Sequence, residues 1–240
     1  VGGPHITAAP EESLKNKDFD LGVIGEGENT FLEFIKIFQE NKQFGDIDGI
    51  VYRKGNETVR TKPRKLIENL DDLPFPTHHL LPSIKLYHPQ IHSMKKQPIA
   101  PIMSSRGCPF QCIYCDKSVF GTKYRVRSSK NVVDEIEYLV KNFGVNEIIF
   151  LDDNFTLIRD RILNLCDEII RRKIKISWSC STRADEVDEE LLKLMKKSGC
   201  WMIAVGIESG NSKILQIANK KISLEKIREA VELMNKCGIR

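Results

Sequence analysis

Short apolar runs and helical patterns alternate along the second part of the chain. The runs occupy residues 99–104, 147–151, 175–180 and 201–207, and each predicts a buried strand. After each strand, apolar residues recur at helical spacing and predict an amphipathic helix. The residues that carry this spacing are Val132, Val133, Ile136, Leu139, Val140 and Phe143; Ile158, Ile162, Leu165 and Ile169; Val187, Leu191, Leu194 and Met195; and Leu224, Ile227, Val231 and Met234. Such alternation predicts an α/β fold with a parallel sheet, as a TIM-like (βα) barrel or half-barrel.

The pattern before residue 69 is mixed. Residues 20–24 predict a short buried strand, and Thr30 with Glu33 has the spacing of a capping box at the start of a helix. Residues 49–52 and 58–60 flank a Gly-Asn turn and predict a hairpin. We therefore expect a first region over residues 1–68.

A segment rich in proline and histidine separates this region from the periodic one. Residues 69–96 contain His78, His79, His88 and His92 at irregular spacing. This composition predicts a solvated linker, although four histidines also raise the alternative of a metal site. The periodic domain then covers residues 97–240.

Composition excludes several classes of protein. The chain has 240 residues, 41% of them hydrophobic, which is enough for a packed core and excludes a disordered chain. Its 37 basic and 33 acidic side chains leave a net charge of +4, spread along the chain, which does not predict nucleic-acid binding. Basic stretches such as 171–173 fall at predicted helix ends, where they complement the helix dipole. No apolar run approaches the 18 residues that predict a membrane-spanning helix.

The two ends suggest an internal piece of a longer protein. The chain starts at Val1-Gly2-Gly3-Pro4, with neither the basic nor the apolar region of a signal peptide. It stops at Gly238-Ile239-Arg240, directly after a helical pattern. We expect the substrate site to depend on parts that lie outside this sequence.

Cysteine usage supplies the clearest chemistry. An odd count of seven without a secretion signal argues against a disulfide framework and favours the reducing cytoplasm. Four cysteines stand singly in apolar surroundings and predict small buried side chains. The other three, Cys108, Cys112 and Cys115, lie within eight residues, directly after the first predicted strand.

Three thiolates at this spacing can hold one soft metal centre. Structural zinc normally has four ligands, and no fourth cysteine or histidine lies near in the sequence, so zinc would need a distant ligand. A 4Fe–4S cluster held by three cysteines leaves one iron open to an external ligand. The ligand count therefore favours a catalytic cluster over a structural or electron-storage one.

Polar residues follow every predicted strand of the parallel sheet. They are Ser104, then Asp152-Asp153-Asn154, then Ser181-Thr182-Arg183, and then Glu208-Ser209-Gly210. Function collects at the carboxyl ends of strands in parallel βα folds. We therefore expect one site at this edge, together with the cysteines.

The motif Cys-x-x-x-Cys-x-x-Cys, with an aromatic residue before its last cysteine, resembles the radical S-adenosylmethionine (SAM) enzymes over residues 97–240. The resemblance implies that Cys108, Cys112 and Cys115 hold a 4Fe–4S cluster and that SAM chelates the fourth iron. One electron from the cluster would cleave SAM to methionine and a 5′-deoxyadenosyl radical. Tyr114 would lie against the adenine.

The same resemblance assigns a carboxylate after the second strand to the SAM amino group. Many members have Gly-Gly-Glu there, whereas this chain has Leu151-Asp152-Asp153-Asn154-Phe155, like a subset of the family. Asp152 and Asp153 are both candidates. Because neighbouring strand residues face opposite ways, we expect only one of them to face SAM.

Further SAM contacts are implied after the third and fourth strands. Arg183 would bind the SAM carboxylate, with an ion pair to Asp185 as the alternative. Glu208 would meet the ribose hydroxyls, with a helix N-terminal carboxylate as the alternative. Ser181 and Thr182 are either polar lining residues or ordinary caps.

The N-terminal region resembles the last part of the Rossmann-like cobalamin-binding domain found in one class of radical SAM enzymes. The resemblance rests on Val1–His5, Asp18–Asp20 and Gly25–Glu28. It implies that Gly2 and Gly3 let the backbone approach the nucleotide tail of cobalamin, where a Cβ would clash. A simple turn is the alternative, and some members keep the domain without the cofactor.

The resemblance implies cobalamin-dependent radical methylation of an unactivated carbon in a small-molecule substrate. A radical ring closure or rearrangement without methyl transfer is the rival within the same class. A non-catalytic iron–sulfur or zinc module is the rival from another class. Flavodoxin or ferredoxin is the electron donor implied by the family.

Overall fold

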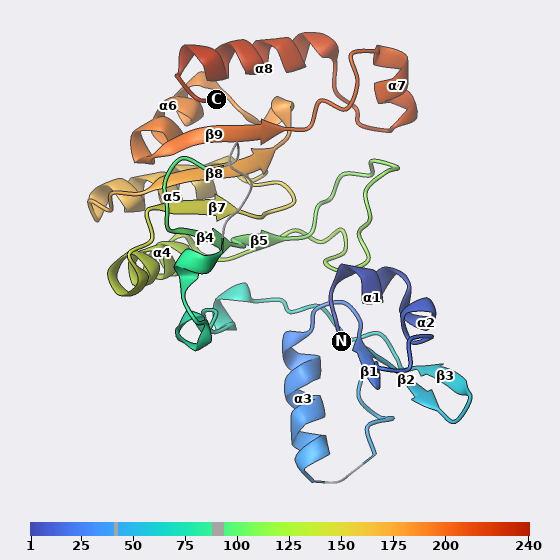
Figure 1. Cartoon of the computed structure of the whole chain (residues 1–240). Coiled ribbons are helices and arrows are strands. Elements are labelled where there is room, and N and C mark those ends of the chain that lie inside the picture. The colour runs from blue at the N-terminus through green and yellow to red at the C-terminus, as the bar shows by residue number, and fades with distance from the viewer. Residues whose placement is uncertain (41–42, 88–93) are drawn as a thin grey trace. The chain divides into compact units, whose positions relative to one another are not determined.

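The computed structural model describes residues 1–40, 43–87 and 94–240 (Figure 1). His88 and His92 of the predicted linker lie outside these ranges. The described chain divides into two compact units. The first unit contains Val1–Glu68, Gly107–Pro109 and Cys115–Tyr124, and the second contains Asn69–Arg106, Phe110–Tyr114 and Arg125–Arg240. The loop 107–124, which carries the three clustered cysteines, is therefore shared between the units.

The second unit is built on a four-stranded parallel sheet in the order β4-β7-β8-β9 (Figure 1). Its strands are β4 (Ile99–Ile102), β7 (Glu147–Phe150), β8 (Ser177–Thr182) and β9 (Cys200–Val205). This confirms the predicted parallel α/β fold, and each strand overlaps its predicted run. Since all four strands run the same way, their carboxyl ends meet at one edge of the sheet.

The four predicted helices follow the strands, and a fifth, short helix at Ser212–Ile217 was not predicted. They are α4 (Ser129–Phe143), α5 (Arg159–Arg171), α6 (Glu189–Ser198), α7 (Ser212–Ile217) and α8 (Leu224–Lys236). Local signals set their ends: Ser128 caps α4 by accepting a hydrogen bond from the Asn131 N–H, and Gly144 ends it in the left-handed conformation. The buried faces of these helices and the strands form one apolar core around Trp178, Phe150 and Phe155.

The third strand extends further than predicted at the edge where the site is expected, whereas β4 and β9 each end two residues earlier than predicted. The third strand was expected at 175–180, but β8 continues to Thr182. Ser181 and Thr182 pair with Ala204 and Val205 of β9. They are therefore strand residues, because polar side chains do not end a strand whose main chain still has a partner.

A two-stranded antiparallel pair, β5 (Ser105–Arg106) and β6 (Arg125–Val126), follows β4. The cysteine loop 107–124 runs between these two strands. Short one-turn helices at Leu70–Asp72, His78–Leu80 and Ile84–Leu86 occupy the segment before β4. His78 is buried there and contacts the ring of Phe143, so the prediction of a solvated segment is wrong for this histidine.

The first unit contains an antiparallel sheet in the order β1-β2-β3. Its elements are α1 (Pro4–Ala8), α2 (Pro10–Ser13), β1 (Leu21–Val23), α3 (Glu28–Gln39), β2 (Ile50–Lys54) and β3 (Glu57–Arg60). The strand at 20–24 and the hairpin are confirmed. Aromatic residues of α3 and the following segment pack on a small core of Leu21, Val23, Ile47 and Ile50.

The predicted capping box is wrong. Helix α3 starts at Glu28, directly after Gly27, so Thr30 lies inside the first turn. Thr30 is fully buried, and its hydroxyl donates a hydrogen bond to the carbonyl oxygen of Asp48. This hydrogen bond joins residues 18 positions apart in the chain, so a local sequence pattern does not reveal it.

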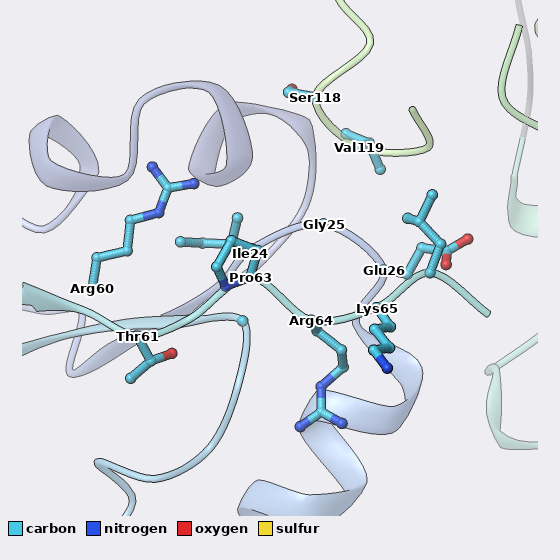
Figure 2. A pocket seen from close by; sticks show the side chains of 12 residues that line it. Ile24, Gly25, Glu26, Arg60, Thr61, Pro63, Arg64, Lys65, Ser118 and Val119 are labelled. Carbon is cyan, nitrogen blue, oxygen red and sulfur yellow. The ribbon is translucent and has the colours of Figure 1, made fainter. Parts of the chain in front are cut away.

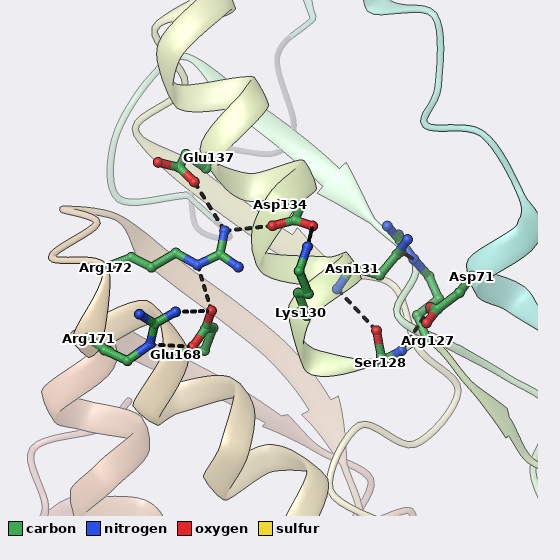
Figure 3. A network of polar contacts seen from close by, with 10 residues as sticks. All are labelled: Asp71, Arg127, Ser128, Lys130, Asn131, Asp134, Glu137, Glu168, Arg171 and Arg172. Carbon is green, nitrogen blue, oxygen red and sulfur yellow. Dashed lines mark hydrogen bonds and ion pairs between the residues drawn. The ribbon is translucent and has the colours of Figure 1, made fainter.

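The outer surface of α4 and α5 carries a network of charged side chains (Figure 3). Arg172 binds Asp134, Glu137 and Glu168, and Arg171 binds Glu168 with two nitrogens. These pairs tie the end of α5 to α4.

None of the helices among the described residues has the length and apolarity that a membrane crossing demands.

Candidate active site

Tyr114 and Glu208, two residues expected to contact SAM, meet through a lysine that the sequence did not single out. Lys220 Nζ lies 3.0 Å from Glu208 Oε1 and donates a hydrogen bond of 3.1 Å to the Tyr114 hydroxyl oxygen. Lys220 is almost fully buried, with 5% of its side chain exposed, whereas Glu208 and Tyr114 are partly open to solvent. A buried cation thus holds two exposed side chains together at the edge where β9 ends.

The backbone around Glu208 is adapted to this contact. Glu208 has φ of +63°, a left-handed conformation that costs a non-glycine residue free energy and is common at functional sites. A Cβ on Gly206 would lie 2.7 Å from Glu208 Oε1 and 2.9 Å from Lys220 Nζ. A side chain at 206 would therefore make the ends of the Glu208 and Lys220 side chains shift.

The neighbours of Glu208 and Tyr114 shift the pKa values of both side chains. The hydrogen bond from Lys220 holds the pKa of Glu208 below its ordinary value, so this carboxylate is ionised at neutral pH. Partial burial raises the pKa of Tyr114, and Cys112 and Glu208 raise it further. The tyrosine is therefore a neutral hydroxyl. An ionised carboxylate near an aromatic ring suits the hydroxyls and the flat base of a nucleoside.

Asp152, which follows β7, is buried and takes part in a network of hydrogen bonds. It is 4% exposed and accepts hydrogen bonds from the Ser104 N–H (2.7 Å), the Ser104 hydroxyl (2.5 Å) and the Ser105 hydroxyl (2.6 Å). Arg161 of α5 also donates to the Ser104 hydroxyl and attracts the carboxylate. Burial outweighs these contacts and raises the pKa of Asp152.

Asp153, the other candidate for the SAM amino group, is exposed. Its neighbour Asn154 points into the protein, where its Nδ2 donates to Glu186 and its Oδ1 accepts from Thr182. Ser181, the polar candidate on β8, is exposed, while its carbonyl oxygen accepts from the Phe155 N–H. The alternation of inward and outward side chains thus separates Asp152 from Asp153.

Arg183 is placed in the protein by two contacts. Its Nε and Nη2 donate to the two carboxylate oxygens of Asp185 at 2.9 and 2.8 Å, and its guanidinium lies 3.8 Å from the ring centre of Phe110. The structure thus forms the ion pair that the sequence left open. The remaining nitrogen, Nη1, is buried without a hydrogen-bond partner among the described residues. One donor of Arg183 is therefore left over for a further acceptor.

The loop with the three clustered cysteines closes on itself at its base. Gly107 has φ of +84°, and a Cβ there would lie 2.4 Å from the carbonyl oxygen of Lys123. Cys112 is buried, Cys108 is half-buried and Cys115 is exposed, and all are thiols rather than disulfides. A loop that only glycine can close, carrying three soft thiol donors, fits the donor set of an iron–sulfur cluster.

The described residues contain no group of three or more His, Cys, Asp or Glu side chains arranged to hold a single metal ion. Three of the four single cysteines, Cys166, Cys180 and Cys200, are buried in the core of the second unit as predicted, whereas Cys237 is only half-buried. Burial raises the pKa of Cys166 to about 12 and also raises that of Cys180. These thiols are packing residues.

A pocket of about 120 Å³ lies in the first unit (Figure 2). It is lined by the Gly25–Glu26 turn, by the segment after β3 and by Ser118 and Val119. Figure 2 shows the side chains of Arg60 and Arg64 pointing apart rather than converging. Gly2 and Gly3 do not line this pocket. Gly3 has φ of +104° and precedes α1, so its conformation requires glycine whatever it binds.

Sequence reasoning missed Lys220, Phe110 and Arg161. Arg161 lies on the apolar face of α5, one residue before Ile162. A charged residue on a buried face usually has a specific partner, so the sequence could have indicated that Arg161 takes part in a buried contact. Lys220 precedes another lysine and looks like an ordinary surface residue. Its burial depends on the fold alone.

A parallel βα sheet with polar residues at its carboxyl edge and a three-cysteine loop after its first strand defines an enzyme of the partial (βα)-barrel class. The profile of the Radical SAM superfamily matches residues 102–240, more than half of the chain. The chain belongs to the radical SAM superfamily, whose cofactors are a 4Fe–4S cluster and SAM.

Curated relatives match the whole chain. An uncharacterised methyltransferase of Pyrococcus horikoshii is 35% identical over 241 residues, which cover 100% of this chain and 51% of the relative. The anaerobic magnesium-protoporphyrin IX monomethyl ester cyclase of Rubrivivax gelatinosus is 33% identical, over 100% of this chain and 43% of the relative. The chain thus spans about half the length of these relatives.

Solved structures share the fold. The cobalamin-dependent radical SAM enzyme OxsB with aqua-cobalamin bound superposes with a TM-score of 0.84 at 22% identity, over 100% of this chain and 35% of that one. The radical SAM methyltransferase TsrM of Kitasatospora setae gives 0.77 at 22% identity, over 99% and 47%. The predicted fold class and superfamily are confirmed.

Proposed function

We propose that this chain carries the cluster and SAM sites of a radical SAM methyltransferase that uses cobalamin. The observation that carries the proposal is the meeting of Tyr114, Glu208 and Lys220 at the carboxyl edge of the parallel sheet. This contact supports a nucleoside site, because it brings an aromatic ring and an ionised carboxylate together. Cys108, Cys112 and Cys115 would hold the 4Fe–4S cluster.

For each remaining candidate residue we propose a role that its placement supports. Asp153 would bind the SAM amino group, because it is exposed while Asp152 is buried and committed to Ser104 and Ser105. Arg183 would offer Nη1 to the SAM carboxylate while Asp185 fixes its orientation. Ser181 would line the site beside them. Glu208 would accept hydrogen bonds from the ribose hydroxyls.

The cluster, when bound, supplies one electron that breaks the C5′–S bond of SAM and gives methionine and a 5′-deoxyadenosyl radical. The chain's own residues bind and orient SAM for this cleavage. The radical would take a hydrogen atom from a substrate carbon and leave as 5′-deoxyadenosine, and cobalamin, when bound, would supply a methyl group taken from a second SAM. A donor such as flavodoxin or ferredoxin, in the reducing cytoplasm, would restore the electron.

Methylation is favoured over ring closure by the relatives. The Pyrococcus horikoshii relative is named a methyltransferase, and OxsB and TsrM are described with cobalamin. The cyclase of Rubrivivax gelatinosus, at 33% identity, supports radical cyclisation as the second candidate. Gly2 and Gly3 are our candidates for the cobalamin contact in the first unit.

The test starts with anaerobic reconstitution by iron and sulfide. We expect an EPR signal from the reduced cluster that shifts when SAM is added, and 5′-deoxyadenosine with methionine after reduction. A signal unmoved by SAM, with no 5′-deoxyadenosine, would contradict the proposal and indicate a non-catalytic iron–sulfur module. Zinc without iron in the purified protein would indicate the zinc alternative.

Cysteine variants test the ligand assignment. Cys112→Ala should lose the cluster, whereas Cys166→Ala, the matched control in the core, should keep the iron content of the unchanged chain. Equal iron in both variants would show that Cys112 is not a ligand. Methylated and cyclised products distinguish the two candidate reactions once a substrate is found.

A further inference from the structure

The turn that follows α7 contacts the cysteine loop through two hydrogen bonds. Asn219 Nδ2 donates a 2.7 Å hydrogen bond to the carbonyl oxygen of Gln111, and the Ile113 N–H donates a 3.1 Å bond to the carbonyl oxygen of Ala218. Gln111 and Ile113 are the neighbours of Cys112 on either side. The main chain is therefore tied down directly before and directly after this cysteine.

The third contact of the turn reaches the next functional residue. Lys220 donates to the Tyr114 hydroxyl and pairs with Glu208. Three consecutive residues, Ala218, Asn219 and Lys220, thus contact residues 111, 113 and 114 of the loop.

The conformation of the turn explains why these residues can reach the loop. Asn219 has φ of +53°, in the left-handed region where asparagine is among the best-tolerated non-glycine residues. Lys221 has the same φ, and the Lys220 N–H donates a 3.0 Å hydrogen bond to the carbonyl oxygen of Leu215, so the main chain leaves helix α7 at these residues. At this end of α7 the Asn219 amide bonds to the Gln111 carbonyl oxygen, and the buried Lys220 ammonium pairs with Glu208. A helical continuation of α7 would point both side chains elsewhere.

The segment between Phe110 and Tyr114 has no helix or strand of its own. Without outside contacts its main chain would keep conformational entropy, which a bound cluster would have to remove. Contacts that order the segment in advance make ligand binding more favourable. Arg183, stacked on Phe110, supports the same segment from the end of β8.

We propose that the turn 218–220 is a positioning element of the active site. Asn219 fixes the main chain on which Cys112 presents its thiol, and Lys220 fixes Tyr114 relative to Glu208. The proposal rests on the proposed function, because it assigns to the turn an effect on cluster retention and on SAM binding. Neither Asn219 nor Lys220 needs to touch the cluster for this effect.

Two substitutions of Asn219 separate its hydrogen bond from its backbone conformation. Asn219→Asp keeps the shape and tolerates the left-handed conformation but cannot donate to Gln111, and Asn219→Gly adopts that conformation freely and lacks the side chain. Asn142→Asp is the matched control, since Asn142 Nδ2 donates to the carbonyl oxygen of Tyr138 in α4, far along the chain from the site.

The readout is the rate at which an iron chelator removes the reconstituted cluster, at equal thermal stability of the variants. Loss of one hydrogen bond of ordinary strength predicts release about five to ten times faster in both Asn219 variants and an unchanged rate in Asn142→Asp. Asn219 variants that release the cluster no faster than the control would overturn the role of Asn219. Asn219→Gly keeps this test decisive if Asn219→Asp folds poorly.

Lys220 is tested by SAM affinity, measured from the EPR shift during titration. Lys220→Met should retain the cluster and bind SAM about tenfold more weakly, and Lys220→Arg should recover part of the loss. A Met variant that binds SAM like the unchanged chain, or an Arg variant as weak as Met, would overturn the role of Lys220.

The two proposals fail in different ways. An unchanged chain that assembles no cluster, or whose EPR signal ignores SAM, removes the proposed function and this inference with it. If the unchanged chain passes both tests and the Asn219 and Lys220 variants behave like it, the positioning role is wrong and the proposed function stands.

Discussion

The carboxylate of Asp152 accepts a hydrogen bond of 2.7 Å from the main-chain N–H of Ser104, and this bond ties the end of β7 to the chain just after β4. The cysteine loop begins three residues after Ser104. Asp152 therefore stabilises the strand end from which that loop departs, while Asp153 beside it remains exposed.

Asp152→Asn should destabilise the protein. The amide group replaces an acceptor that faces two hydroxyl donors and the charge of Arg161. We expect a loss of about 2–3 kcal/mol, since buried donors lose their partner. Thermal unfolding measures it, as a midpoint lower by about 5–10 °C for a chain of this size.

Asp153→Asn, the matched change at the neighbouring position, should have the opposite profile. We expect an unfolding midpoint close to that of the unchanged chain, because an exposed carboxylate contributes little to stability. SAM binding should weaken about tenfold or more through the loss of a charged partner for the amine. If Asp152→Asn weakened SAM binding and Asp153→Asn did not, the assignment of the two aspartates would be reversed.

Gly107→Ala should disrupt the base of the cysteine loop. Its Cβ would meet the Lys123 carbonyl oxygen at 2.4 Å in addition to the cost of a left-handed φ. Gly55→Ala is the control, because Gly55 has φ of +64° with nothing within 4 Å of the added Cβ. We expect about 1–2 kcal/mol of destabilisation for Gly55→Ala and clearly more for Gly107→Ala.

Iron content completes this comparison. Gly107→Ala should take up less iron on reconstitution, whereas Gly55→Ala, in the hairpin turn between β2 and β3, should take up as much as the unchanged chain. Equal iron uptake and equal stability in the two variants would show that the close approach of Gly107 to Lys123 is unimportant.

The network on α4 and α5 should make stability depend on acid pH (Figure 3). Hydrogen bonds from Arg171 and then Arg172 lower the pKa of Glu168 from 4.5 to about 2. A carboxyl group with a lower pKa in the folded state stabilises the fold above its unfolded pKa, and this stabilisation is lost as the pH falls from about 4.5 toward 2.

Glu168→Gln measures this contribution. The unchanged chain should have the higher unfolding midpoint at pH 7, and the difference between the two proteins should shrink steadily below pH 4.5. A difference that stayed constant down to pH 2.5 would mean that the arginines do not bind the ionised form selectively.

Thiol reactivity should sort the cysteines into two groups. Thiolates react with alkylating reagents, so burial that raises the pKa of Cys166 to about 12 suppresses its reaction at pH 8. In the cluster-free protein, mass spectrometry should find Cys115 labelled first and Cys166 and Cys180 unlabelled until the protein is unfolded. Early labelling of Cys166 would contradict its place in the core.

The strands and helices of the second unit could be predicted because their pattern is local. Apolar residues such as Ile148 and Phe150 on β7, or Leu165 and Ile169 on α5, recur with the period of the element that buries them. The positions of the candidate site residues along the chain were predicted from the same alternation, since parallel strands present their carboxyl ends at one edge.

Errors arose where a side chain finds its partner far away in the sequence. Thr30 has the local spacing of a cap, yet its hydroxyl bonds to Asp48 from inside α3. Ser181 and Thr182 look like loop residues, yet β9 provides main-chain partners that extend β8 through them.

The sequence by itself determined the fold class and the candidate ligands of this protein: three thiols at a fixed spacing, polar residues after each strand, and the periodicity of a parallel α/β fold. Only the tertiary structure decided which side chains act together. It buried Asp152 and left Asp153 exposed, paired Arg183 with Asp185, and brought Asn219 and Lys220 to residues more than 100 positions earlier in the chain. The reason is that spacing fixes which residues share an element, whereas burial and hydrogen bonding between elements depend on how those elements pack.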